Sequence, residues 1–181
     1  PATDENVYLE AQQRRYGFVV VQTEDEVSAI NMAVGAAHAG VRAATSTSGP
    51  GFTLMAEGIG FASMTEAPGP VVFLWQRGGP STGLPTRQEQ ADLRFALQPA
   101  HGEFSHIVVA PGDVEEIVHD SYTAFNWAER YQLPVIVILD KHLAAAYVTL
   151  DDLDLERLPP VDRGFYYSPD GQPEAAYLRY A

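Results

Sequence analysis

Short apolar runs alternate with longer amphipathic stretches along most of the chain. Several of the runs have the length and the valine and isoleucine content of buried parallel strands. We expect strands at residues 17–22, 42–48, 71–76, 106–110 and 134–140. The stretches between them predict helices over about 24–39, 53–64, 88–93 and 113–131. This alternation predicts an α/β fold, with a mostly parallel sheet and helices on both of its faces.

The clearest local signals frame the helix expected over 24–39. Thr23 and Glu26 form the T-x-x-E pattern of a capping box, in which two side chains satisfy main-chain N–H groups at a helix start. Gly40 stands where a helix-ending glycine is common. The segment 48–51 (Ser-Gly-Pro-Gly) is expected to be a tight loop between a strand and the next helix.

The character of the chain changes near residue 150. An acidic run and the pair Pro159-Pro160 follow the last expected strand. We therefore expect one domain over residues 1–150, with residues 151–181 forming a linker or tail towards a following domain.

Composition excludes several classes of protein. Of 181 residues, 46% are hydrophobic and 10% aromatic, far above the content of disordered chains. The net charge of −13 disfavours nucleic acid and anionic membrane surfaces as partners. No apolar run approaches the roughly 20 residues of a membrane span, and no signal-peptide pattern is visible, so we expect a cytoplasmic protein.

Metal and thiol chemistry is not expected on this chain. It contains no cysteine, so it can supply neither a thiolate nucleophile nor ligands to an iron–sulfur cluster. The five histidines lack the spacing of metal ligands.

Three unusual segments follow expected strands. They are the acidic run 24–26, the segment 48–51, and Arg77 with the glycine-rich loop behind it. In an open parallel sheet, ligands bind beyond the carboxyl ends of the strands. The three segments therefore predict a binding site at one edge of the sheet.

Helical geometry selects Glu26 among the three acidic residues. At about 100° per residue, Glu26 lies in line with the apolar stripe Ile30, Ala33, Val34 and Ala37, so it points inward. One interpretation is structural, with Glu26 as the second half of the capping box. The other is functional, with a carboxylate held against apolar neighbours that shares a proton with a buried ligand nitrogen.

Arg77 has two interpretations as well. A guanidinium at the end of a buried strand can bind a carboxylate through two hydrogen bonds, or it can simply be solvated. The glycine loop behind it is not a nucleoside-triphosphate loop, because Leu84-Pro85 stand where lysine and serine or threonine are needed.

Taken together, the motifs resemble a known family. They are E-D-E at 24–26, T-S-G-P-G-F at 47–52, E-G-I-G at 57–60 and Q-R-G-G-P-S-T-G-L-P-T at 76–86. They are similar to the alpha subunit of 2-oxoacid:ferredoxin oxidoreductases, closest to the 2-oxoglutarate type, over nearly the whole chain. In that family the region is the pyrimidine-binding domain for thiamine diphosphate.

The resemblance implies a role for each matching residue. Glu26 matches the glutamate that hydrogen-bonds N1′ of the aminopyrimidine and starts the activation of the cofactor. Arg77 matches the arginine that binds the substrate carboxylate, and Ser81 and Thr82 are implied to shape the substrate pocket. The loop that lines the pyrimidine end of the cofactor is Ser48, Gly49, Pro50, Gly51 and Phe52.

The resemblance also implies partners and a reaction. A 2-oxoacid, expected to be 2-oxoglutarate, is decarboxylated, its acyl group passes to coenzyme A, and its electrons pass through iron–sulfur clusters to ferredoxin. The diphosphate, its Mg²⁺ and a [4Fe–4S] cluster belong to a beta subunit, in an (αβ)2 assembly. The family's Y-P-I-T-P segment is expected just before Pro1.

Two other functions are compatible with the sequence pattern. One is the pyrimidine domain of a different thiamine enzyme, such as a transketolase-like protein or a 2-oxoacid dehydrogenase beta chain. The other is a flavodoxin-like docking module without catalytic activity, in which Glu26 is only a helix cap.

Overall fold

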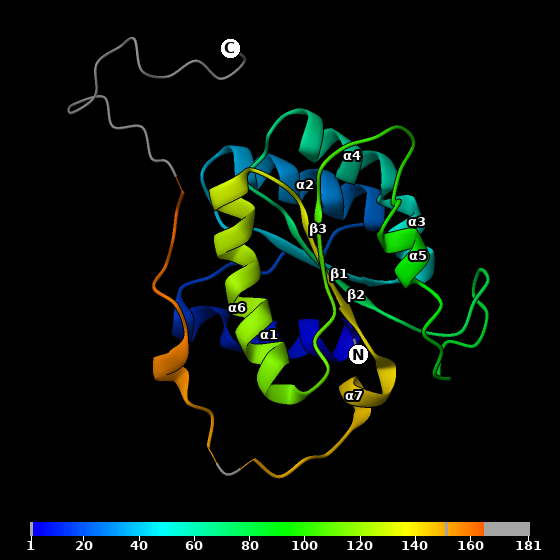
Figure 1. Cartoon of the computed structure of the whole chain (residues 1–181), viewed down its shortest axis with the longest axis vertical. Coiled ribbons are helices and arrows are strands. Elements are labelled where there is room, and N and C mark those ends of the chain that lie inside the picture. The colour runs from blue at the N-terminus through cyan, green and yellow to red at the C-terminus, as the bar shows by residue number, and fades with distance from the viewer. Residues whose placement is uncertain (1, 151, 165–181) are drawn as a thin grey trace.

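The fold is built on four parallel strands. A computed structural model describes residues 2–150 and 152–164, and the sheet runs in the order β1-β2-β4-β3 (Figure 1). The strands are β1 (Ala44–Ser48), β2 (Val71–Trp75), β3 (Ile107–Val109) and β4 (Val135–Leu139). The predicted α/β class and parallel sheet are confirmed.

The order of the strands follows their composition. The two central strands, β2 and β4, read VVFLW and VIVIL and are almost wholly buried, as expected where helices cover both faces. β1 reads ATSTS and lies at one edge, where its polar side chains face less apolar surroundings. Its last residue, Ser48, pairs with Trp75 at the end of β2. The carboxyl ends of these two strands therefore lie side by side.

Helices cover the two faces unequally. One face carries α2 (Glu26–His38), α3 (Gly49–Leu54), α4 (Ala56–Met64) and α5 (Leu93–Ala96), and the other carries α6 (Val114–Tyr131). Alternate residues of β2 and β4 point to opposite faces, so Val72 and Ile136 contact the first group while Val71 and Val135 contact α6. The predicted covering of both faces is confirmed.

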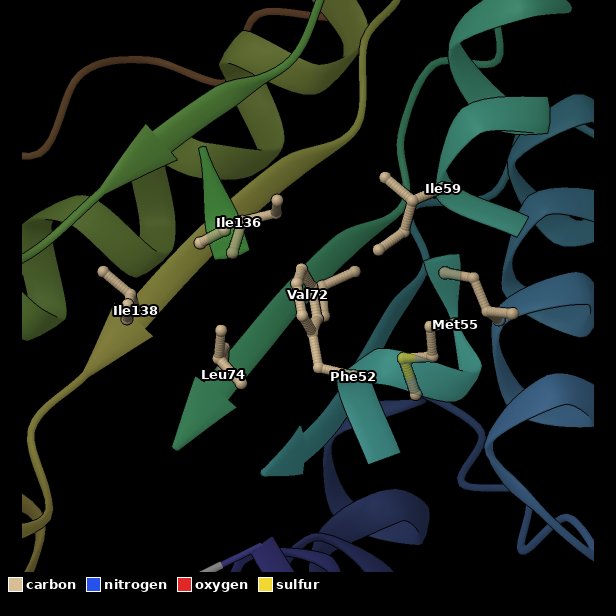
Figure 2. Close-up of a cluster of buried hydrophobic side chains, with 9 residues drawn as sticks. Phe52, Met55, Ile59, Val72, Leu74, Ile136 and Ile138 are labelled. Atoms are coloured by element: carbon tan, nitrogen blue, oxygen red, sulfur yellow. The ribbon is translucent and has the colours of Figure 1, made fainter. Parts of the chain in front are cut away.

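The larger core cluster lies beneath α3 and α4. Figure 2 shows Phe52, Met55 and Ile59 directed towards side chains of β2 and β4. Phe52 also packs edge-on against Phe95 of α5, with ring centroids 5.3 Å apart. This cluster holds the helix that begins at Gly49 firmly on the sheet.

The strand predicted at 17–22 is wrong. Residues 18–22 form no strand, and Val19 and Val21 are 81% and 55% exposed. A strand needs a neighbour to satisfy its main chain. Within residues 2–150 and 152–164, nothing pairs with the outer edge of β1, and the segment instead follows the helix α1 (Ala2–Tyr16), which apolar spacing did not predict.

The tight loop predicted at 48–51 is also wrong. Gly49 begins α3, and Pro50 suits that position because the first turn of a helix needs no main-chain N–H donors. The single helix predicted over 53–64 is two helices, which meet at Met55. The short helix predicted near 88–93 begins later, at Leu93.

The chain returns to the domain after β4. Beyond α7 (Lys141–Ala145) and the short 3-10 helix Leu155–Arg157, the Asp162 main-chain N–H donates to Asn126 of α6, at 3.0 Å. The boundary at residue 150 stays a prediction, and most of the predicted tail, 165–181, lies outside the described residues. None of the helices in the described part of the chain has the length and apolarity needed to span a bilayer.

Candidate functional site

Two strand ends and two helix starts meet at one edge of the sheet. β1 passes directly into α3, and β2 is followed by Gln76 and Arg77. α2 begins nearby, since its first residue contacts α3 at Gly51. The predicted convergence of the acidic run, the segment 48–51 and Arg77 at the carboxyl ends of the strands is thus largely realised.

The capping box predicted for α2 is not formed. Asp25 is the N-cap residue, and its carboxylate accepts the Ser28 main-chain N–H at 2.7 Å. The Thr23 hydroxyl donates to the Asp25 carbonyl instead, at 3.0 Å. Because Asp25 caps the helix, Glu26 is its first residue and its carboxylate is free for another role.

Glu26 is partly buried, while Glu24 and Asp25 are exposed, as helical geometry predicts. The predicted stripe of Ile30, Ala33, Val34 and Ala37 is buried along the same helix. No hydrogen bond to the Glu26 carboxylate is formed within the described part of the chain. A half-buried carboxylate without a donor is suited to receive one from a ligand.

The Glu26 carboxylate lies against Gly51. A methyl group on Gly51 would lie 2.6 Å from Glu26 Oε1 and would overlap the Thr47 hydroxyl. Only glycine allows α3 to approach the acid this closely. Glu26 also lines a cavity of about 500 Å³, which is bounded by residues 18–25 and by Ala44, Thr45 and Ser46 of β1.

The segment predicted to line a cofactor is anchored by its last residue. Phe52 is fully buried, Gly49 and Gly51 are buried, and Ser48 and Pro50 are partly exposed. The backbone from 48 to 51 is therefore held rigidly where the sheet ends. A rigid backbone with two glycines can contact a flat ligand closely.

Arg77 is partly buried, and its Nε is completely buried without a hydrogen-bond partner. Asp92 Oδ2 is in the same condition. Burial raises the pKa of Asp92, and the Glu89 charge adds to the rise, while the Arg77 main-chain N–H and guanidinium charge act in the opposite direction. Two unsatisfied groups of opposite charge therefore lie in one neighbourhood.

Ser81 and Thr82 are not brought into this site. Both are exposed, in a loop closed by a bridge between Gly78 and Leu84. Neither lines the cavity beside Glu26. Their implied role in the substrate pocket stays a prediction.

The loop after Arg77 is tied to the end of β4. Gln90 donates to Asp140 at 2.6 Å, and this hydrogen bond is the main cause that lowers the pKa of Asp140. The Gln88 amide and the His142 ring lie 2.7 Å apart. These contacts border a second cavity of about 500 Å³ at the same edge of the sheet.

Sequence reasoning missed Asp92, Gln76 and Thr47. No pattern marks them, because their importance comes from contacts with Gly49, Arg77 and Gly51 across the fold. The sequence did contain one signal for Asp92, which is an acid directly before a helix.

Comparison with known proteins agrees with the resemblance. Residues 1–175 match the family model described as pyruvate flavodoxin/ferredoxin oxidoreductase, thiamine diphosphate-binding. The 2-oxoacid:ferredoxin oxidoreductase 1 alpha subunit of Sulfurisphaera tokodaii is 48% identical over 203 residues, which cover 98% of this chain and 32% of that protein. The 2-oxoglutarate synthase subunit KorA of Methanocaldococcus jannaschii is 41% identical and is matched over 86% of this chain and 44% of its own length.

A solved structure gives the same result. The 2-oxoglutarate:ferredoxin oxidoreductase from Magnetococcus marinus, with 2-oxoglutarate, coenzyme A and succinyl-CoA bound, superposes with a TM-score of 0.73 at 44% identity. The match covers 76% of this chain and 24% of that one. The chain thus spans between about a quarter and under half of the length of these relatives. It belongs to the pyruvate flavodoxin/ferredoxin oxidoreductase family, within that family's thiamine diphosphate-binding domain.

Proposed function

We propose that this domain supplies the pyrimidine-binding half of a thiamine diphosphate site in a 2-oxoacid:ferredoxin oxidoreductase. The oxidoreductase decarboxylates a 2-oxoacid, by our proposal 2-oxoglutarate, and transfers the acyl group to coenzyme A. The observation that carries the proposal is the Glu26 carboxylate, which has no donor among the described residues and lies against Gly51 at the carboxyl edge of the sheet.

The residues present fit the cofactor. Glu26 holds a proton at N1′ of the aminopyrimidine, because a half-buried carboxylate hydrogen-bonds a ring nitrogen strongly. Ser48, Gly49, Pro50, Gly51 and Phe52 form the wall that contacts the ring. When bound, thiamine diphosphate supplies a nucleophilic carbon that attacks the carbonyl of the 2-oxoacid.

Arg77 binds the substrate carboxylate in this proposal. Its buried and unpartnered Nε is the donor that a carboxylate would complete. Ser81 and Thr82 then contribute to the pocket only if their loop closes over the substrate, because both are exposed in the present structure.

A beta subunit completes the site. It binds the diphosphate, with Mg²⁺, and holds a [4Fe–4S] cluster, because this chain has no cysteine to ligate iron. Ferredoxin accepts the electrons. We propose an (αβ)2 assembly that acts in the cytoplasm.

The test is reconstitution. The full-length alpha subunit is co-expressed with candidate beta subunits, and a panel of 2-oxoacids is screened for coenzyme A-dependent reduction of viologen. We expect reduction with 2-oxoglutarate that requires both subunits and thiamine diphosphate. Transfer of a sugar or lipoyl group would indicate a different thiamine enzyme, and assembly without cofactor binding would indicate a docking module.

A further inference from the structure

Aspartate occupies the position before five helical segments in the described part of the chain. Four of these aspartates accept a main-chain N–H from the segment that follows, and they are Asp25, Asp113, Asp140 and Asp154. Asp92 precedes α5 in the same way, but its side chain makes no capping hydrogen bond. A capping hydrogen bond stabilises a helix start, so Asp92 forgoes an interaction that its position offers.

The Asp92 carboxylate turns towards α3 instead. The position that a Cβ of Gly49 would take lies 2.6 Å from Oδ1 and 3.0 Å from Oδ2. The carboxylate therefore rests on the backbone of the first residue of α3. It fits there because that residue has no side chain.

Two consecutive residues at the end of β2 hold Asp92 in place. The buried Gln76 side chain accepts the Asp92 main-chain N–H at 3.4 Å. The Arg77 main-chain N–H and guanidinium both act on the Asp92 carboxyl group. Asp92 thus joins the end of β2 to the start of α3.

Asp92 and Arg77 also share an unusual property. Asp92 Oδ2 and Arg77 Nε are the two fully buried side-chain polar atoms without a hydrogen-bond partner in the described residues. Such atoms are uncommon in folded proteins and cost stability. Their occurrence together, at the edge where ligands bind in parallel sheets, indicates selection for a function.

We propose that Asp92 is a positioning residue for Arg77, fixing the end of β2 against Gly49 so that the guanidinium points at the carboxylate of the 2-oxoacid. The inference rests on the proposed function of Arg77. It predicts that Asp92 affects the binding of the oxoacid and leaves the later steps unchanged.

The test measures steady-state kinetics of the assembled oxidoreductase carrying Asp92→Ala, Asp92→Asn, Arg77→Ala or the Asp92→Ala/Arg77→Ala pair. We expect Asp92→Ala to raise KM for the 2-oxoacid about fivefold, with kcat and KM for coenzyme A within about twofold of wild type. Asp92→Asn keeps the shape and an acceptor oxygen, so its KM should stay within about twofold of wild type. In the Arg77→Ala background, Asp92→Ala should add nothing.

Asp113→Ala is the control, because it removes a helix cap on α6 without touching Arg77. Its KM should equal that of wild type even where thermal unfolding shows a loss of stability. An additive double variant, an unchanged KM in Asp92→Ala, or an Asp92→Asn enzyme as impaired as Asp92→Ala would overturn the inference. An Arg77→Ala enzyme with normal KM would instead overturn the proposed function of Arg77.

Discussion

At the scale of single residues, the site depends on a carboxylate that is exempt from local duty. Asp25 caps α2, so Glu26 does not have to. The next turn of the helix then directs Glu26 towards Gly51 and the cavity beside β1. A change at Glu26 should therefore affect chemistry and spare the fold.

We predict that Glu26→Gln lowers oxoacid-dependent viologen reduction by the assembled oxidoreductase about a hundredfold or more, because the amide cannot exchange a proton with the cofactor. Size-exclusion chromatography should show normal assembly. Glu24→Gln is the matched control, since Glu24 is exposed two residues away, and it should keep full activity. Turnover by Glu26→Gln near that of wild type would refute the role of this residue.

At the scale of elements, the site is set by how closely α3 approaches α2. Gly51 has no room for a methyl group, since Thr47 and Glu26 occupy that space. Gly35 lies in α2 with nothing within 4 Å of its Cβ position. The two glycines therefore separate a packing requirement from helix propensity.

We predict that Gly51→Ala displaces the Glu26 carboxylate and lowers the free energy of unfolding by about 1–3 kcal/mol through overpacking. Activity should fall with it. Gly35→Ala should leave activity unchanged and raise stability by about 0.5–1 kcal/mol, because alanine favours helices. Urea denaturation and turnover of the two variants check the difference, and equal effects would contradict it.

Asp140 should make the contact between β4 and the loop after Arg77 sensitive to acid. Its pKa is lowered in the folded state, first by the Gln90 hydrogen bond, so its stabilising effect is present above the ordinary aspartate pKa. That effect is lost as pH falls through the lowered folded-state pKa. Thermal unfolding should show wild type more stable than Asp140→Asn near neutral pH, with the difference vanishing in acid.

Asp152→Asn serves as the control for this titration. Asp152 is exposed, so the variant should match wild type at each pH. A constant difference between wild type and Asp140→Asn down to the most acidic pH would contradict the assignment.

At the scale of the whole molecule, one buried acid links three distant parts of the chain. Glu129 of α6 is 6% exposed and pairs with Arg42 and Arg163, each at 2.7 Å. Arg42 lies just before β1, and Arg163 follows the 3-10 helix and also donates to the Gly40 carbonyl. The region after residue 158 is thereby attached to the same body as the sheet.

We predict that Arg42→Ala lowers the free energy of unfolding by about 2 kcal/mol, because Glu129 stays buried with only Arg163 to balance its charge. Arg157→Ala, which breaks the exposed pair with Asp154, should change stability by less than about 0.5 kcal/mol. Chemical denaturation of both variants is the measurement. Equal losses would show that burial does not decide the strength of these pairs.

The parts of the fold that the sequence predicted are those in which local pattern and burial agree. The runs at 71–76 and 134–140 are apolar throughout and became the two central strands. The inward direction of Glu26 followed from the helical period alone. The runs at 17–22 and 48–51 were misread because a strand also needs a partner, and because a glycine-proline segment can open a helix as well as a turn.

By itself, then, the sequence determined the α/β class, the central strands, the buried face of α2 and, through its motifs, the family. Those properties depend on residues close together in the chain. The tertiary structure alone decided that Asp25 caps the helix, that Gly51 and Thr47 enclose Glu26, and that Asp92 rests on Gly49 beside Arg77. These contacts join residues separated by many positions, and the packing of α3 against α2 and the sheet is the physical reason that they form.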